Sequence, residues 1–163
     1  MKAKLSLVIF FLYSFCIQAQ NRKAAIYNNK MFAEQEKVSK EIIEFFKIFE
    51  NADYNTLEKQ HQKILKQIDK SYKVVAAMPS FENDNSLRDA LLKWLNEYKD
   101  SFENEYKLML PLLSKKDKTQ EEKDKLEQMH QDLIKEEEKL DKELLRVQKE
   151  FAQKHNLTLR ESN

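Results

Sequence analysis

The stretch LEQMHQDLIKEEEKLDKELLRVQKEF, residues 126–151, decides the fold of this chain. Its apolar side chains recur at steps of three and four residues, with one step of seven across Glu137. That spacing places them on one face of an α-helix, as a stripe that other parts of the protein must cover. The residues of the stripe are Leu126, Met129, Leu133, Leu140, Leu144, Val147 and Phe151.

Three further segments carry helical spacing and supply the partners that this stripe needs. The second helix has Asp53 or Asn55 as its N-cap, because a short side chain with an oxygen can accept from the free N–H groups of a first turn. Thr119 and Glu122 form a capping box, which predicts the start of the last helix. The predicted helices are residues 24–49, a second that ends near Ala77, a third that begins near Ser86 and a fourth that ends near Lys154.

Pro111 lies inside the apolar pattern of the third segment. Proline has no N–H to donate to the carbonyl of Lys107, and its ring crowds that carbonyl. We therefore expect a kink or an early stop near Leu110. Four striped helices joined by short connections predict an all-α, up-down-up-down antiparallel four-helix bundle, formed by residues 21–163 as a single domain. A three-helix bundle with one broken helix is the alternative.

The chain contains no glycine and only two prolines among its 163 residues. Rossmann fingerprints, P-loops and EF-hand loops all require glycine, so these nucleotide and calcium sites are not expected. The same composition argues against tight β-hairpins, although asparagine can replace glycine in some turns. Lysine, glutamate, leucine and glutamine dominate the composition, as they do in long helices or coiled coils.

Residues 1–20 have the features of a secretory signal peptide. Two lysines precede an apolar run, residues 5–15, which is too short for a comfortable membrane span. Cleavage is expected after Ala19 or Gln20. An uncleaved N-terminal anchor is the alternative, and no second apolar run approaches the length of a span. The sequence therefore predicts an exported protein without a transmembrane span in its mature form.

Cys16 is the only cysteine and lies within this leader. It is either a lipidation site or a residue that leaves with the leader, and the bulky Phe15 before it favours the second reading. Loss of Lys2 and Lys4 with the leader lowers the formal charge by two, from +1 to −1. Such a near-neutral chain gives no electrostatic signal for nucleic acid or for an anionic membrane.

Two Glu-x-x-His patterns raise the question of a metal site, since ferritin-like bundles use this spacing on two helices. They are Glu58 with His61 and Glu127 with His130. The other ligands would be Glu41 or Glu44 and Glu105. Glutamate is abundant here, however, and both glutamates lie on the flanks of their stripes. We therefore expect surface glutamates and a packing histidine, and predict no catalytic, cofactor-binding or metal-ligating residue.

Glu137 and Glu105 lie on or near apolar stripes, so they form either a polar layer or two positions at the rim of the core. We expect the rim, because a stripe drifts around a long helix. Tyrosines such as Tyr98 and Tyr106 either line a pocket or pack in the core with wet hydroxyl groups, and the core is the expectation. His155 is placed to favour the C-terminal dipole of the last helix.

Several short segments along the mature chain have a familiar pattern. They are Tyr27-Asn28-Asn29, Gln35 to Val38, Ala76-Ala77-Met78-Pro79, Phe81, Tyr98-Lys99, Asn104-Glu105-Tyr106 and the segment from Phe151 to Leu157. In these segments the chain resembles a family of short secreted or surface-exposed, all-helical bacterial proteins of uncharacterised function. The resemblance spans nearly the whole mature chain. It implies export and a helical bundle, and it brings no active-site residues with it.

The functional expectation is a non-enzymatic protein of a Gram-negative bacterium, in the periplasm or on the cell surface. It would bind a protein partner of the cell envelope through a helix face or a bundle end. Two alternatives are a bundle that binds a metal or small ligand near His61 and His130, and a chaperone-like helical protein that holds unfolded outer-membrane clients.

Overall fold

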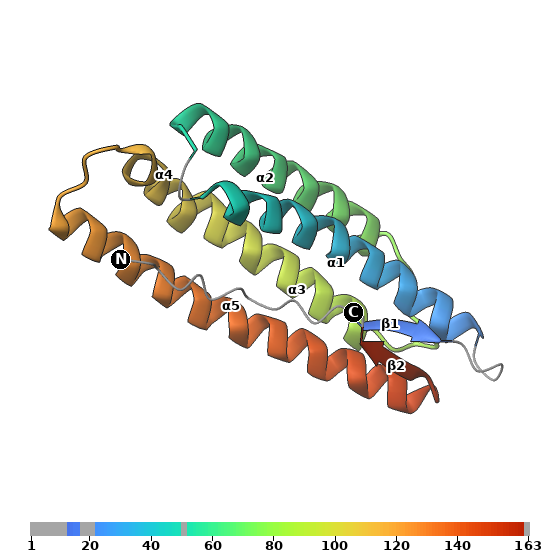
Figure 1. The fold of residues 1–163 in the computed structure, drawn as a ribbon. Helices are drawn as coiled ribbons and strands as arrows, with labels where there is room; N and C mark the ends of the chain where they lie inside the picture. The colour runs from blue at the N-terminus through green and yellow to red at the C-terminus, as the bar shows by residue number, and fades with distance from the viewer. Residues whose placement is uncertain (1–12, 17–21, 50–51, 162–163) are drawn as a thin grey trace.

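The computed structural model describes residues 13–16, 22–49 and 52–161, and within these the chain forms four helices (Figure 1). The third helix is continuous but has three parts, of which the middle part is π-helical. The bounds are α1 Arg22–Ile48, α2 Tyr54–Ala76, the third helix from α3 Ser86–Ser101 through the π-helical segment Phe102–Tyr106 to α4 Lys107–Ser114, and α5 Gln120–Lys154.

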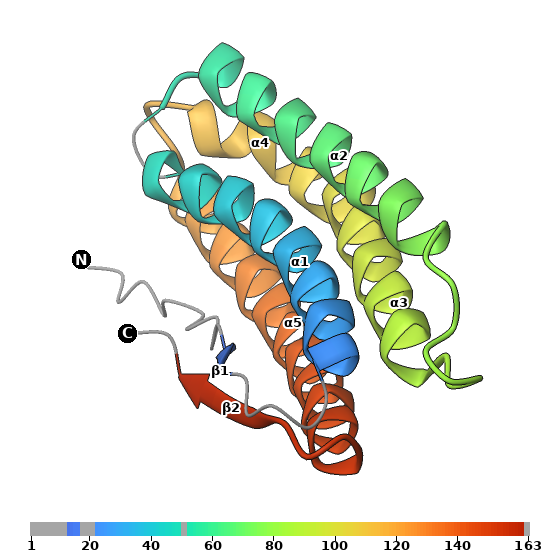
Figure 2. The same cartoon turned by 90° about the vertical axis from the view of Figure 1, so that its right-hand side faces the viewer.

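The four helices run antiparallel to their neighbours in sequence and lie side by side in one bundle (Figures 1 and 2). Their backbones approach most closely between α1 and α2, between α2 and α3, and between α3 and α5. The predicted all-α four-helix bundle is therefore confirmed, with α5 as its longest helix.

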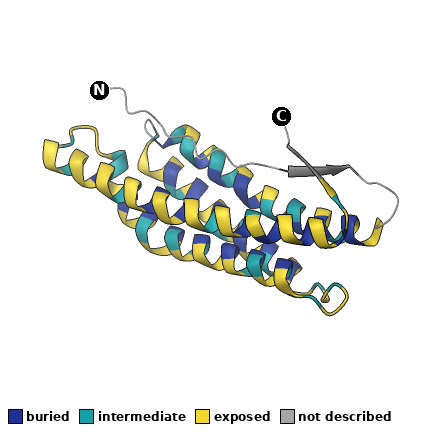
Figure 3. Ribbon diagram, turned by 90° about the horizontal axis from the view of Figure 1, so that it is seen from below, coloured by how far each residue is buried: buried dark blue, intermediate teal, exposed yellow. Residues whose placement is uncertain are grey.

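The core follows the stripes of all four helices, and the exposed residues cover the outer faces (Figure 3). Its centre is aromatic, because Phe45 of α1 packs edge-on against Phe102 and Tyr106 of the third helix. Its largest fully buried side chains include Trp94 and Tyr98. Two of these four aromatic residues of the third helix carry hydroxyl groups and one carries an indole N–H, so the core also contains donors that need partners.

The predicted caps are present at both helix starts. The side chain of Asp53 accepts from the backbone N–H of Thr56, at 3.1 Å. Thr119 and Glu122 exchange side-chain to backbone bonds as a complete capping box. These bonds satisfy N–H groups that a first turn leaves free, which fixes where α2 and α5 begin.

The third helix departs from its predicted shape. It does not stop near Leu110 but remains helical through Pro111 as far as Ser114. Its irregular part is the π-helical segment Phe102–Tyr106, which the sequence did not predict. Segments of this kind are single wide turns within α-helices and occur frequently at functional sites.

Among the residues that the structure describes, three have positive φ, at two chain reversals. Glu82 and Asn83 form the centre of a tight turn, in which Phe81 and Asp84 exchange both backbone hydrogen bonds. Asn156, with φ of 51°, follows the end of α5, where Leu157 N–H donates to Ala152 O at 2.8 Å. That bond is the mark of a Schellman motif. Both reversals therefore form without glycine, and in each of them an asparagine, Asn83 or Asn156, adopts a positive φ.

Two short strands lie beside the bundle. β1 Tyr13–Cys16 pairs antiparallel with β2 Thr158–Glu161, with Tyr13 opposite Glu161. Neither strand was predicted from the sequence. Both predicted cleavage points, after Ala19 and after Gln20, lie outside the described residues.

Candidate functional site

The seam between the third helix and α5 contains two carboxyl groups on successive turns of α5, one buried and one half-buried. The Tyr106 hydroxyl donates to Glu137 Oε1 at 3.1 Å. One turn on, Asp141 Oδ1 accepts from Trp94 Nε1 at 2.8 Å and from the Tyr98 hydroxyl at 3.2 Å. We call these five residues the acid–aromatic cluster. Each carboxyl group takes its donors from an aromatic side chain, so the cluster ties α5 to the third helix through polar contacts inside an apolar seam.

Burial controls the ionisation of this cluster. The Glu137 side chain is only 2% exposed, and this burial raises its pKa to about 8, against the lowering effect of the Tyr106 hydrogen bond. Burial also raises the pKa of Asp141. The pKa values of Tyr98 and Tyr106 are raised well above 10 by burial and by the neighbouring carboxyl groups. An apolar seam disfavours charge, which explains the common direction of all four shifts.

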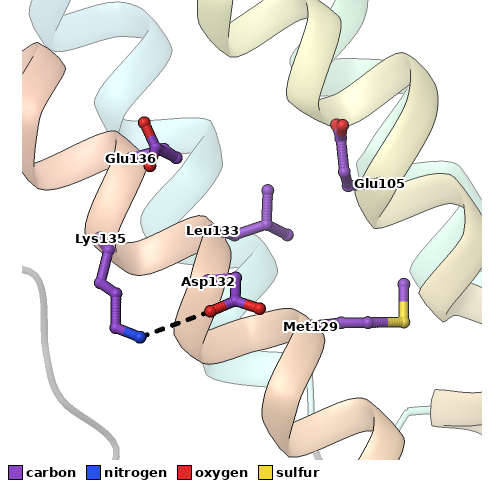
Figure 4. Close-up of a pocket in the computed structure, with 6 residues that line it drawn as sticks. All are labelled: Glu105, Met129, Asp132, Leu133, Lys135 and Glu136. Carbon is purple, nitrogen blue, oxygen red and sulfur yellow. Dashed lines mark hydrogen bonds and ion pairs between the residues drawn. The ribbon is translucent and has the colours of Figure 1, made fainter.

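An open groove lies beside the cluster, between the third helix and the first half of α5 (Figure 4). Its volume is about 390 Å³. Met129 and Leu133 of α5 give it an apolar floor, and Glu105 of the π-helical segment faces them from the other side. The remaining lining residues are Asp132, Lys135 and Glu136.

The charges of the groove are not equally compensated. Lys135 pairs with Asp132 at 3.4 Å, and Lys139 pairs with Glu136 at 2.7 Å. Glu105 has a carboxyl oxygen, Oε2, that is buried and finds no hydrogen-bond partner among the described residues. A buried acceptor without a donor costs free energy, so Glu105 is the one polar group of the lining that gains most from a donor brought by a ligand.

His61 is fully buried and forms a hydrogen bond with the π-helical segment. Its Nε2 lies 2.6 Å from the carbonyl oxygen of Phe102, which can only accept, so Nε2 carries the proton and donates. This bond accounts for the packing role that the sequence predicted for His61. The same bond occupies Nε2, the ring nitrogen that faces the third helix.

His130 has different neighbours from His61. Its ring lies 5.8 Å from that of Phe46 in α1 and 5.2 Å from that of Phe49, the residue directly after α1, and burial lowers its pKa. Glu58 and Glu127 accept hydrogen bonds from glutamines of their own helices, at the surface. Across residues 13–16, 22–49 and 52–161, no three His, Cys, Asp or Glu side chains gather as metal ligands would. The two Glu-x-x-His patterns are therefore not brought together.

A group of aromatic side chains closes the end of the bundle at which α1 begins and α5 ends. Phe81 from the connection after α2 packs against Tyr27 of α1 and Phe151 of α5. His155 joins this group, with its ring 4.5 Å from that of Phe151. It lies at the C-cap of α5, where the sequence placed it, and it is buried.

Sequence reasoning found part of the acid–aromatic cluster and missed part of it. Glu137 was correctly noted as an interruption of the stripe, but the expected rim position is wrong, because the residue is buried. Asp141 was not singled out. Its signal is its position one turn after Glu137, next to Leu140 of the stripe, since residues four apart share a helix face.

Comparison with protein-family models, with curated proteins and with solved structures finds no match for this chain. The resemblance drawn from the sequence therefore remains a prediction. None of the helices within the described ranges is both long and apolar enough to cross a membrane.

Proposed function

We propose that the protein is an exported, non-enzymatic helical bundle that binds a protein partner of the cell envelope in the groove between the third helix and α5. The observation that carries the proposal is the groove itself, where an apolar floor meets the unsatisfied Oε2 atom of Glu105. The signal-peptide features of residues 1–20 support export.

The lining indicates what kind of partner fits. Lysines already compensate Asp132 and Glu136, which leaves Glu105 without a counter-charge among the pairs that the described residues form. Met129 and Leu133 offer apolar contact beside it. The complementary ligand is a protein segment with one lysine or arginine next to apolar side chains, because the cation satisfies Glu105 while its neighbours cover the floor.

The arrangement favours this proposal over a chaperone-like role. A holder of unfolded clients needs a broad exposed apolar surface, and in the described part of the chain the exposed large apolar side chains do not gather on one helix. Ile26 is in α1, Tyr54 and Val74 are at opposite ends of α2, and Leu108 is in α4. Single exposed residues of this kind are ordinary on soluble proteins.

Photocrosslinking in the bacterial host tests the proposal. Benzoylphenylalanine replaces Met129 in the groove, or Val74 on α2 as a matched control outside it. We expect a discrete crosslinked product from position 129 in the envelope fraction, with the summed mass of a partner and the chain without its leader, and none from position 74. The crosslinked segment, identified by mass spectrometry, should contain a lysine or arginine beside apolar residues.

A second substitution separates the groove from its surroundings. Glu105→Gln should reduce the crosslink from position 129, because the amide cannot pair with a cation, whereas the exposed Glu97→Gln on the same helix should not. Equal products from positions 129 and 74, or an unprocessed chain that stays in the cytoplasm, would contradict the proposal.

A further inference from the structure

The acid–aromatic cluster places an ionisable group where its charge has no compensation. Glu137 is almost wholly buried and receives one hydrogen bond, from Tyr106. That bond is a single neutral donor, which offsets only part of the cost of burying a carboxylate. The ionised form of Glu137 is therefore poorly suited to the closed seam.

The neighbouring groups do not relieve this cost. From the third helix, Glu137 faces the hydroxyl groups of Tyr98 and Tyr106, and from α5 it faces the carboxyl group of Asp141. Asp141 is itself acted on by the charge of Glu138, one more acidic group of α5. Among the described residues, the charges that raise the pKa of Glu137 are thus negative, and each makes a second negative charge in the seam less favourable.

We propose that Glu137 holds a proton while the bundle is closed, and that loss of this proton separates the first half of α5 from the third helix. The separation lets water reach the carboxylate. The groove lies directly beside the bond between Tyr106 and Glu137. Its lining includes the residue before each of them, Glu105 and Glu136, so the same movement widens the groove. Only the use of this movement for partner access rests on the proposed function; the movement itself does not.

The chain contains a built-in reporter, since Trp94 is its only tryptophan and belongs to the cluster. The fluorescence of the purified protein is measured from pH 5 to pH 9.5, below the ordinary tyrosine pKa of about 10. We expect the emission of Trp94 to shift to longer wavelength with a midpoint near pH 8, while the helical circular dichroism stays constant. That combination indicates a local opening rather than unfolding.

Glu137→Gln removes the ionisable group but keeps an oxygen for Tyr106, so the fluorescence transition should disappear. Glu138→Gln, at the exposed neighbouring position, is the matched control and should leave it unchanged. Absence of the transition in the unmodified protein, or its persistence in Glu137→Gln, would overturn the proposal.

Two further variants keep the test decisive if Glu137→Gln does not fold. Tyr106→Phe removes the hydrogen bond that lowers the pKa of Glu137, so the midpoint should rise. Asp141→Asn removes the charge that raises it, so the midpoint should fall. Midpoints that do not move in these opposite directions contradict the role of Glu137. Since no partner is present in these measurements, their failure is distinct from failure of the crosslinking experiment.

Discussion

Glu137 and Asp141 illustrate how two carboxyl groups on one helix can differ in their setting. Asp141 accepts from two aromatic donors and is half-buried, whereas Glu137 accepts from one and is more deeply buried. More donors and more water both favour the charged form of a carboxyl group. The site that responds to pH in the neutral and mildly alkaline range is therefore Glu137.

Glu137 should make the free energy of unfolding depend on pH. Its pKa is about 8 in the folded protein and near 4.5 when unfolded, so between these values the folded state binds a proton that the unfolded state has lost. The contribution of this proton to the free energy of unfolding is present in full below pH 4.5. It is lost as pH rises towards 8, at up to about 1.4 kcal/mol per pH unit. Urea unfolding at pH 5, 6, 7 and 8 should show this slope as a difference between the unmodified protein and Glu137→Gln.

The pH dependence of unfolding that remains in Glu137→Gln comes from all other titrating groups. Subtracting it from that of the unmodified protein leaves the contribution of Glu137. Glu137→Leu provides a second reference for the pH profile, since it removes the charge and also leaves the Tyr106 hydroxyl without its acceptor. Parallel pH profiles for the unmodified protein and Glu137→Gln would refute the assignment.

Among the elements, α5 is defined sharply at both ends. It begins at the capping box of Thr119 and ends at the Schellman motif, in which Asn156 adopts a positive φ. Asparagine tolerates this conformation better than other residues with a β-carbon, and glycine tolerates it best. The stability of the C-terminal end of α5 therefore depends on the residue type at position 156.

Substitutions at Asn156 should follow the cost of positive φ. Asn156→Ala should lower the free energy of unfolding by about 1 kcal/mol, and Asn156→Gly should leave it unchanged or raise it slightly. Gln153→Ala, at an exposed helical position in the last turn of the same helix, is the control and should have little effect. Urea unfolding measures all three, and equal losses for Asn156→Ala and Asn156→Gly would be inconsistent with this reason.

The elements were more predictable from the sequence than the cluster between them. The third helix was predicted to begin near Ser86 and the last to end near Lys154, and the structure agrees, because stripes and caps are local signals. The π-helical segment was not foreseen, since His61 takes the Phe102 carbonyl from a distant helix. Glu137 was assigned to the rim for the same reason: only the packed bundle reveals that Tyr106 reaches it.

Across the whole molecule, the two halves of α5 are held differently. In the first half, the buried apolar residues Leu126 and Leu133 are still 9% and 7% exposed, and the groove lies beside them. In the second half, Val147 is 7% exposed, but Leu144, Phe151 and Ala152 are only 2%, 3% and 1% exposed, and Gln148 bonds Gln35 of α1. Less complete burial lowers the free energy needed to open a segment locally.

Hydrogen exchange should reveal this difference. Backbone amides of residues 124–136 should exchange at least tenfold faster than those of residues 140–152, which corresponds to a difference in opening free energy of about 1.4 kcal/mol. Mass spectrometry of peptic fragments measures both ranges in one experiment, with the central part of α2 as an internal reference. Equal protection along α5 would contradict the uneven anchoring.

The pairing of β1 with β2 has a consequence for the order of events during synthesis. β1 lies within the proposed leader and emerges from the ribosome early, whereas β2 is made only after all four helices. On the proposed route of export, the leader engages the secretion machinery before its partner strand exists. A chain in which the two strands are paired is then one that was not exported and still carries its leader. The strand pairing would therefore mark the unprocessed precursor.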